Sequence, residues 1–182
     1  MKEPVGEFAI VVMGPSGSGK STLARGLTQH LRDALFIEGD DYHSPANIKK
    51  LSSGIPLSEE DRCHFIDSVG MALRAANQPA VASCSALRRV HRERLRHFAS
   101  NILFVWIDVP PEELQRRVKM RPDHFMPASL LSDQLATFEP PSPPECFVKI
   151  DGMLGPGDQI SALLDHIAAS HPHFSRTAAS GG

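Results

Sequence analysis

Residues 14–21 read Gly-Pro-Ser-Gly-Ser-Gly-Lys-Ser and fit the pattern G-x-x-x-x-G-K-[ST], which constrains the fold of this chain more than any other feature. An apolar run at 8–13 precedes them and is typical of a buried strand, while Leu23, Leu27 and Leu31 follow at helical spacing. A strand, a glycine loop and a helix in this order predict a P-loop, which binds phosphate groups. A glycine-rich turn that matches by chance would not explain the flanking strand and helix.

The residue types of this loop suit a polyphosphate. Glycines have no Cβ, so the backbone can adopt positive φ and bring its N–H groups close to the phosphates. Lys20 supplies a positive charge towards the β- and γ-phosphates, and the Ser21 hydroxyl is suited to ligate Mg²⁺. We therefore predict that a nucleoside triphosphate and Mg²⁺ bind here. The predicted nucleotide-binding residues of the loop are Gly14, Ser16, Gly17, Ser18, Gly19, Lys20, Ser21 and Thr22.

Length and charge limit the class of protein. The 182 residues are 41% hydrophobic and 22% charged, which fits one globular domain, expected at 1–170. A net charge of -2 argues against a general nucleic-acid binder. We expect a cytoplasmic protein without a membrane partner, because the first seven residues lack an apolar signal core and no apolar run could cross a bilayer. Cys63, Cys84 and Cys146 lack the spacing of a zinc site and are expected to be reduced thiols.

Strand and helix patterns alternate along the chain. This alternation predicts an α/β fold with a parallel sheet of about five strands and helices on both faces. The tail at 171–182 is expected to be flexible. The strands are expected at 8–13, 34–37, 79–84, 102–109 and 146–151.

Two acidic residues follow the second predicted strand. Ligands collect at the carboxyl ends of strands in an open α/β sheet, and Asp40 and Asp41 fall at such an end. Asp40 is the candidate catalytic carboxylate. Its alternative role is that of a turn former or helix cap, which is also the simplest interpretation of Asp41.

Three arginines are candidates for binding an anion. Arg62 falls in the first turn of a helix that opens with a capping-box pattern at 58–61, an unfavourable place for a cation. Either its acidic neighbours compensate or the position serves an anionic ligand. Arg88 and Arg92 follow the third predicted strand, where guanidinium groups suit a carboxylate or phosphate, although such a row is more often solvated surface.

Residues 118–127 are predicted to form a mobile lid. Pro122 and Pro127 bracket a basic, aromatic segment, and an ordinary surface loop is the alternative. Arg117 precedes this segment and Arg121 lies within it.

An ordered series of further motifs follows the glycine loop. They are Gly-Asp-Asp-Tyr-His at 39–43, Asn47 with Lys50, Gly-Ile-Pro-Leu at 54–57, Glu-Asp-Arg at 60–62, Cys-Ser-Ala-Leu at 84–87, Arg92, His-Phe-Met-Pro at 124–127, and Gln134 with Thr-Phe-Glu-Pro at 137–140. Together with the loop at 14–21, this series closely resembles the gluconokinase family of small P-loop, shikimate-kinase-like carbohydrate kinases, and the resemblance implies the P-loop kinase fold. The P-loop is common to very many proteins, whereas the ordered series of the other motifs is specific. The resemblance runs from about residue 9 to about residue 151.

The resemblance implies transfer of the γ-phosphoryl group of ATP, with Mg²⁺, to the C6 hydroxyl of D-gluconate, and a homodimer, which is common in the family. Asp40 would deprotonate the hydroxyl, and Arg117 and Arg121 would reach the nucleotide. His124 would order the closed lid or touch the substrate. The catalytic residues predicted on this basis are Lys20, Asp40, Arg62 and Arg92, and the substrate-binding residues are Asp40, His43, Arg62, Arg88, Arg92 and His124.

Departures from the family pattern bear on the choice of sugar acid. The family usually has Trp, Lys, Tyr and Gly at the positions that hold Phe65, Arg88, His91 and Asp123 here. Other acceptors on this fold are shikimate, adenylylsulfate and nucleotides. The chain lacks the Gly-Gly-Gly loop of shikimate kinases after the third predicted strand. The alternative to a kinase is a nucleotide-dependent switch protein. The chain has no N-K-x-D sequence, the motif that recognises guanine, which argues against a switch that binds GTP.

Overall fold

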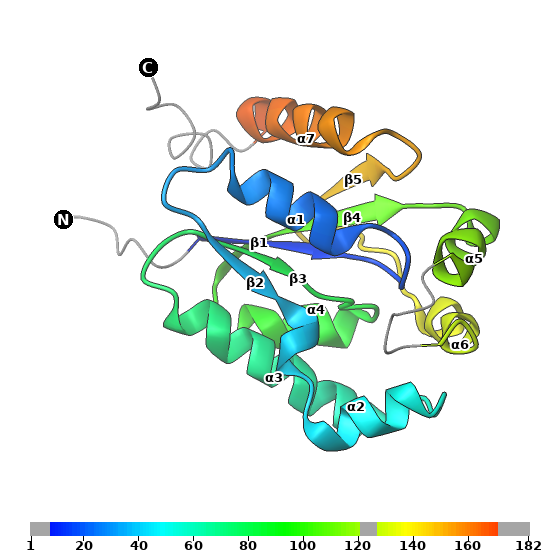
Figure 1. The fold of residues 1–182 in the computed structure, drawn as a ribbon. Coiled ribbons are helices and arrows are strands. Elements are labelled where there is room, and N and C mark those ends of the chain that lie inside the picture. The colour runs from blue at the N-terminus through cyan, green and yellow to red at the C-terminus, as the bar shows by residue number, and fades with distance from the viewer. Residues whose placement is uncertain (1–7, 121–126, 171–182) are drawn as a thin grey trace.

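Five parallel strands form one sheet, with the first strand of the chain in the middle (Figure 1). The structure is a computed structural model that describes residues 8–120 and 127–170. The strand order is β2-β3-β1-β4-β5, so β1 pairs with β3 on one side and with β4 on the other. The strands are β1 (Phe8–Met13), β2 (Leu35–Glu38), β3 (Ala80–Ser83), β4 (Asn101–Asp108) and β5 (Phe147–Asp151).

Helices cover both faces of this sheet. Helices α1 (Lys20–Thr28) and α7 (Pro156–Ser170) lie on one face, and α3 (Glu59–Ala75) and α4 (Arg89–Arg96) lie on the other (Figure 1). A hydrophobic core lies on each face of the sheet. Alternate residues of β1 belong to one core or the other, because successive side chains of a strand point to opposite faces. Ile10 and Val12 pack with α1 and α7, whereas Val11 and Met13 pack with α3.

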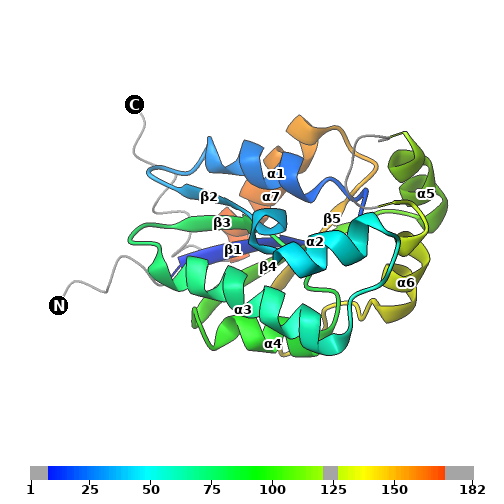
Figure 2. The same ribbon diagram turned by 60° about the horizontal axis from the view of Figure 1, so that its bottom comes forward.

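The remaining helices gather at the end of the sheet where the strands finish, as Figures 1 and 2 show. A short 3₁₀ helix directly continues β2, and α2 follows it in the chain. These elements are η1 (Gly39–Tyr42), α2 (Pro45–Ser52), α5 (Pro111–Lys119) and α6 (Leu130–Thr137). They surround the region in which an open α/β sheet binds its ligands.

The α/β fold predicted from the sequence is confirmed, with differences in detail. The capping box of α3 is present: Ser58 Oγ accepts from Asp61 N at 3.1 Å, and Asp61 Oδ2 accepts from Ser58 N at 2.9 Å. Leu31 lies beyond the end of α1, although its side chain is buried as its spacing indicated. The η1 helix has no counterpart among the predicted elements. Of the helices in the described ranges, none has the length and apolarity needed to cross a membrane.

Candidate active site

The loop between β1 and α1 has the geometry of a phosphate cradle. Gly14, Gly17 and Gly19 adopt φ of 143°, 84° and 95°, which side chains with a Cβ rarely tolerate. A Cβ on Gly17 would also lie 2.9 Å from Val118 Cγ2. Helix α1 begins at Lys20, so the positive end of its dipole faces the loop.

A buried hydroxyl in this loop supports the fit to a phosphate. Ser18 is almost fully buried, and its Oγ has no hydrogen-bond partner within the part of the chain that the structure describes. Buried polar atoms nearly always have a partner, so an unsatisfied hydroxyl calls for one from outside the protein. Phosphate oxygens would accept this hydrogen bond. The residues present therefore fit a bound nucleotide.

The predicted metal-ligating hydroxyl has an acidic neighbour. Ser21 Oγ donates to Glu38 Oε1 at 3.0 Å, and the Ser83 hydroxyl donates to the same oxygen. Lys20 Nζ donates to Pro15 O at 2.9 Å, which holds the ammonium group over the loop. Glu38 was not among the predicted site residues. Its signal in the sequence was its position at the end of the second strand, two residues before Asp40.

The carboxylate of Asp40 is positioned by the junction between β2 and η1. Gly39 N donates to Ser83 Oγ at 3.2 Å, which anchors η1 to the neighbouring strand. His43 Nε2 lies 4.0 Å from Asp40 Oδ1, and its ring stacks on Phe65 with centroids 3.9 Å apart. Burial lowers the pKa of His43 although the charge of Asp40 acts against it, so the imidazole is neutral at pH 7.

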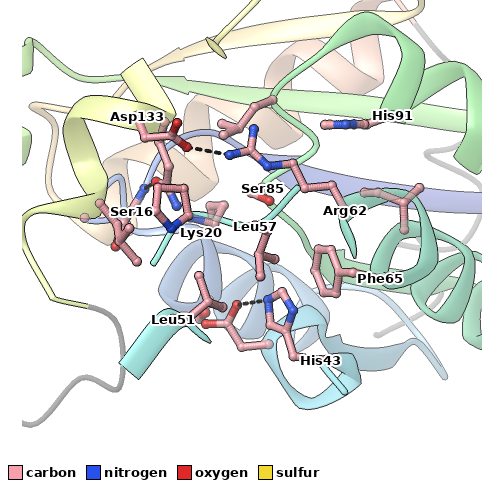
Figure 3. A pocket seen from close by; sticks show the side chains of 18 of the residues that line it. Ser16, Lys20, His43, Leu51, Leu57, Arg62, Phe65, Ser85, His91 and Asp133 are labelled. Carbon is pink, nitrogen blue, oxygen red and sulfur yellow. Dashed lines mark hydrogen bonds and ion pairs between the residues drawn. The ribbon is translucent and has the colours of Figure 1, made fainter. Parts of the chain in front are cut away.

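Arg62 of α3 places a positive charge on the wall of the site opposite the phosphate loop. Its Nη2 forms an ion pair with Asp133 Oδ2 of α6 at 2.5 Å, and its Nη1 donates to Thr137 Oγ1 at 3.3 Å. The acid that compensates this cation in the first turn of α3 therefore comes from 71 residues further along the chain. Figure 3 shows Arg62 reaching towards Asp133 across the pocket.

One pocket contains these groups. In Figure 3, Ser16 and Lys20 lie on one side of it and His43 and Phe65 on the other. His91 also lines the pocket, with its Nε2 3.0 Å from Glu59 Oε1. Burial lowers the pKa of His91, against the influence of Glu59. The predicted site residues that line the pocket are Ser16, Gly17, Gly19, Lys20, Ser21, Thr22, Asp40, His43 and Arg62.

Known proteins resemble this chain over most of its length. The protein-family model described as "AAA domain" matches residues 10–141. A protein named gluconokinase from Gluconobacter oxydans is 44% identical over 163 residues, which cover 88% of this chain and 91% of the relative. The chain belongs to the gluconokinase family.

Two crystal structures support this family assignment. A gluconokinase from Sinorhizobium meliloti 1021 superposes with a TM-score of 0.76 at 36% identity, covering 91% of this chain and 99% of the other. An unliganded sugar kinase from Janibacter sp. HTCC2649 gives a TM-score of 0.83 at 38% identity, covering 90% and 95%. Two of the positions at which this chain departs from the usual gluconokinase pattern, Phe65 and His91, line the pocket.

Arg92 does not lie where its match to the gluconokinase motifs suggested. It is fully buried outside the pocket, where its Nε and Nη2 bond to Glu145 at 2.6 Å and 3.1 Å. Its Nη1 donates to Glu139 O at 2.9 Å and Ala86 O at 3.1 Å. The guanidinium group is thus occupied by the protein, which corrects the expectation of a direct substrate contact.

Arg88 and Arg117 do not line the pocket either. Arg88 is part of the protein surface and pairs with Glu59 and Glu139. Arg117 donates from Nε to Glu113 and from Nη2 to Gly152 O at 2.8 Å. Arg121 and His124, like Asp123, most of the predicted lid and the tail at 171–182, lie outside the described residues.

Proposed function

We propose that the protein transfers the γ-phosphoryl group of ATP to the C6 hydroxyl of D-gluconate and so forms 6-phospho-D-gluconate. One observation carries this proposal: Lys20, Asp40 and Arg62 line the same pocket. A small-molecule kinase needs a phosphate cradle, a carboxylate near the attacking hydroxyl and a cation for an acidic acceptor. Membership of the gluconokinase family supports D-gluconate as that acceptor.

Each group has a defined task in this reaction. Asp40 would orient the C6 hydroxyl and accept its proton, and Lys20 would stabilise the negative charge on the transferring phosphoryl group. Arg62 would bind the carboxylate of gluconate. Ser21 and Glu38 would hold Mg²⁺, since hydroxyl and carboxylate oxygens are its preferred ligands. When bound, Mg²⁺ neutralises charge on the β- and γ-phosphates.

A panel of acceptors tests the proposal. Gluconate, other aldonates, shikimate, adenylylsulfate and AMP would each be offered with ATP and Mg²⁺, with ADP release measured and the product identified by NMR. We expect gluconate to stimulate ADP release most and to be phosphorylated at C6. Turnover of shikimate or a nucleotide without turnover of gluconate would contradict the proposal. Slow hydrolysis that no acceptor stimulates would favour a nucleotide-dependent switch.

The homodimer implied by the family resemblance and the cytoplasmic location stay predictions. Light scattering of the purified chain would test the oligomeric state.

A further inference from the structure

Two adjacent residues of α6 bind opposite walls of the pocket. Gln134 Oε1 accepts a hydrogen bond from Ser16 N of the phosphate loop at 2.7 Å. Asp133 Oδ2 forms the 2.5 Å ion pair with Arg62 of α3. These partners come from segments 118 and 71 residues away in the chain. Helix α6 therefore connects the nucleotide end of the site to the acceptor end.

Helix α6 carries both contacts on consecutive residues. It is short, Leu130–Thr137, and Leu130 and Leu131 are buried on one side of it. Thr137 adds a second contact to Arg62 one turn after Asp133. Because Asp133 and Gln134 are consecutive on one rigid helix, a displacement that alters one contact also alters the other.

Both contacts involve groups that a ligand would use. Ser16 N is one of the main-chain N–H groups of the phosphate loop, and its hydrogen bond is accepted by the Gln134 side chain. The Arg62 side chain is 14% exposed, and the Asp133 carboxylate occupies one edge of its guanidinium group. An anionic acceptor must share or displace that carboxylate, and a nucleotide phosphate competes in the same way with Gln134.

We propose that Asp133 and Gln134 are positioning residues through which nucleotide and sugar acid favour each other's binding. This inference rests on the proposed function. A ligand that releases one contact of α6 lowers the cost of releasing the other, so the second ligand binds more tightly. The coupling is reciprocal, because the affinity of each ligand changes by the same factor when the other is bound.

Calorimetry with four variants tests the inference. The Kd of gluconate is measured with and without a non-hydrolysable ATP analogue and Mg²⁺. The wild type is expected to bind gluconate at least about fivefold more tightly with the analogue. In Asp133→Asn, Gln134→Ala and the double variant, this factor should fall towards one. The control is Ser132→Ala, on the exposed side of the same helix, which should keep the wild-type factor.

The direction in which the gluconate affinity of Asp133→Asn changes distinguishes the loss of a positioning contact from general damage to the fold. Asp133→Asn keeps the shape of the side chain but frees Arg62 from a competing charge, so without nucleotide it should bind gluconate about two- to fivefold more tightly. General damage would instead weaken binding of both ligands and lower the melting temperature. Asp133→Asn and Gln134→Ala with the wild-type coupling factor, or a wild type with a factor of one, would overturn the inference.

The proposed function can fail separately from this coupling. If gluconate binds with coupling but wild-type enzyme forms no 6-phosphogluconate, the reaction is wrong and the role of α6 stands. If product forms but the factor in the wild type is one, the reaction stands and the role of α6 is wrong.

Discussion

Arg92 and Glu145 form a bidentate ion pair inside the protein, with side chains only 1% and 4% exposed. Burial acts to raise the pKa of Glu145, but the hydrogen bonds from Arg92 and Ser142 N, together with the charge of Arg92, lower the pKa overall, so the carboxylate is charged at neutral pH. The carbonyl groups of Ala86 and Glu139 complete the shell of Arg92. This arginine joins α4 to the segment after β3, which leads into the pocket, and to the proline-rich segment before β5.

Removing Arg92 should therefore act first on stability. Arg92→Ala leaves the charge of Glu145 buried and unpaired, and we expect the free energy of unfolding to fall by about 3–5 kcal/mol. Urea unfolding at pH 7 would measure it. Arg96→Ala, at an exposed position of the same helix, should change it by less than about 0.5 kcal/mol. If the Arg92→Ala protein had wild-type stability and a raised KM for the acceptor, the result would support the original prediction that Arg92 contacts the substrate.

The different fates of the arginines show what the sequence could and could not predict. Local patterns identified the P-loop, the capping box at 58–61 and the α/β alternation, because each depends on neighbours in the chain. Arg88, Arg92 and Arg96 share one helical spacing, yet the structure buries only Arg92. Its partner Glu145 lies 53 residues further along the chain, and no local pattern indicates such a pairing.

The residues of the pocket also divide into those that local patterns predict and those that depend on contacts between distant parts of the chain. Most of the predicted loop residues line the pocket and were indicated by the local P-loop pattern, and Asp40 lines it too, as expected because ligand sites of this fold lie at strand ends. The contributions of Asp133 and Gln134 were missed, because they arise only when α6 packs across the end of the sheet. Glu38 was missed for a different reason: its neighbour Asp40 offered a simpler explanation of the acidic cluster.

Asp40→Asn should abolish most turnover and leave nucleotide binding unchanged. The amide keeps the size of the side chain but cannot accept the proton, so we expect kcat with gluconate to fall by about 10²- to 10⁴-fold. Coupled-assay kcat and calorimetric Kd for an ATP analogue would check both statements. Asp41→Asn is the matched control, because Asp41 is exposed and does not line the pocket. A near-normal kcat in Asp40→Asn would show that another group takes the proton.

Lys20→Ala should slow phosphoryl transfer to every acceptor. Lys20 is the first residue of α1, and its ammonium group lies beside the glycine loop. Loss of this group removes charge stabilisation of the transition state. We expect the barrier to rise by about 3 kcal/mol or more, read as kcat/KM. Lys49→Ala, at an exposed position of α2, should leave kcat/KM unchanged. An effect on gluconate but not on other acceptors would contradict this role.

The two pocket histidines should make the fold less stable in mild acid. Burial lowers the pKa of His43 and His91 below the ordinary value of 6.5, which they regain on unfolding. The unfolded state thus binds more protons below pH 6.5, so the free energy of unfolding decreases as the pH falls. Urea unfolding from pH 7 to pH 5.5 should show this decrease, with a shallower slope in His91→Gln. An unchanged slope in that variant would show that His91 does not contribute.

Gly39→Ala should displace the carboxylate of Asp40 without changing its chemistry. A Cβ at this position would lie 2.1 Å from the carbonyl oxygen of Ser83, a backbone atom of the neighbouring strand that cannot move aside cheaply. The junction that carries Asp40 must shift instead, and misplacement by about 1 Å can cost about 10²-fold in rate. We therefore expect kcat to fall by at least about tenfold, together with a loss of about 1–3 kcal/mol in the free energy of unfolding.

The control for this change is Gly157→Ala in α7, where a Cβ would meet nothing within 4 Å. That variant should keep the wild-type kcat and be as stable as the wild type or slightly more so, because alanine restricts the unfolded chain. If Gly39→Ala also keeps kcat within about twofold, then the position of Asp40 does not depend on the close contact between η1 and β3. In that case the catalytic geometry would have to be set by the elements that pack on η1 from the other side, chiefly α3 through the stacking of His43 on Phe65.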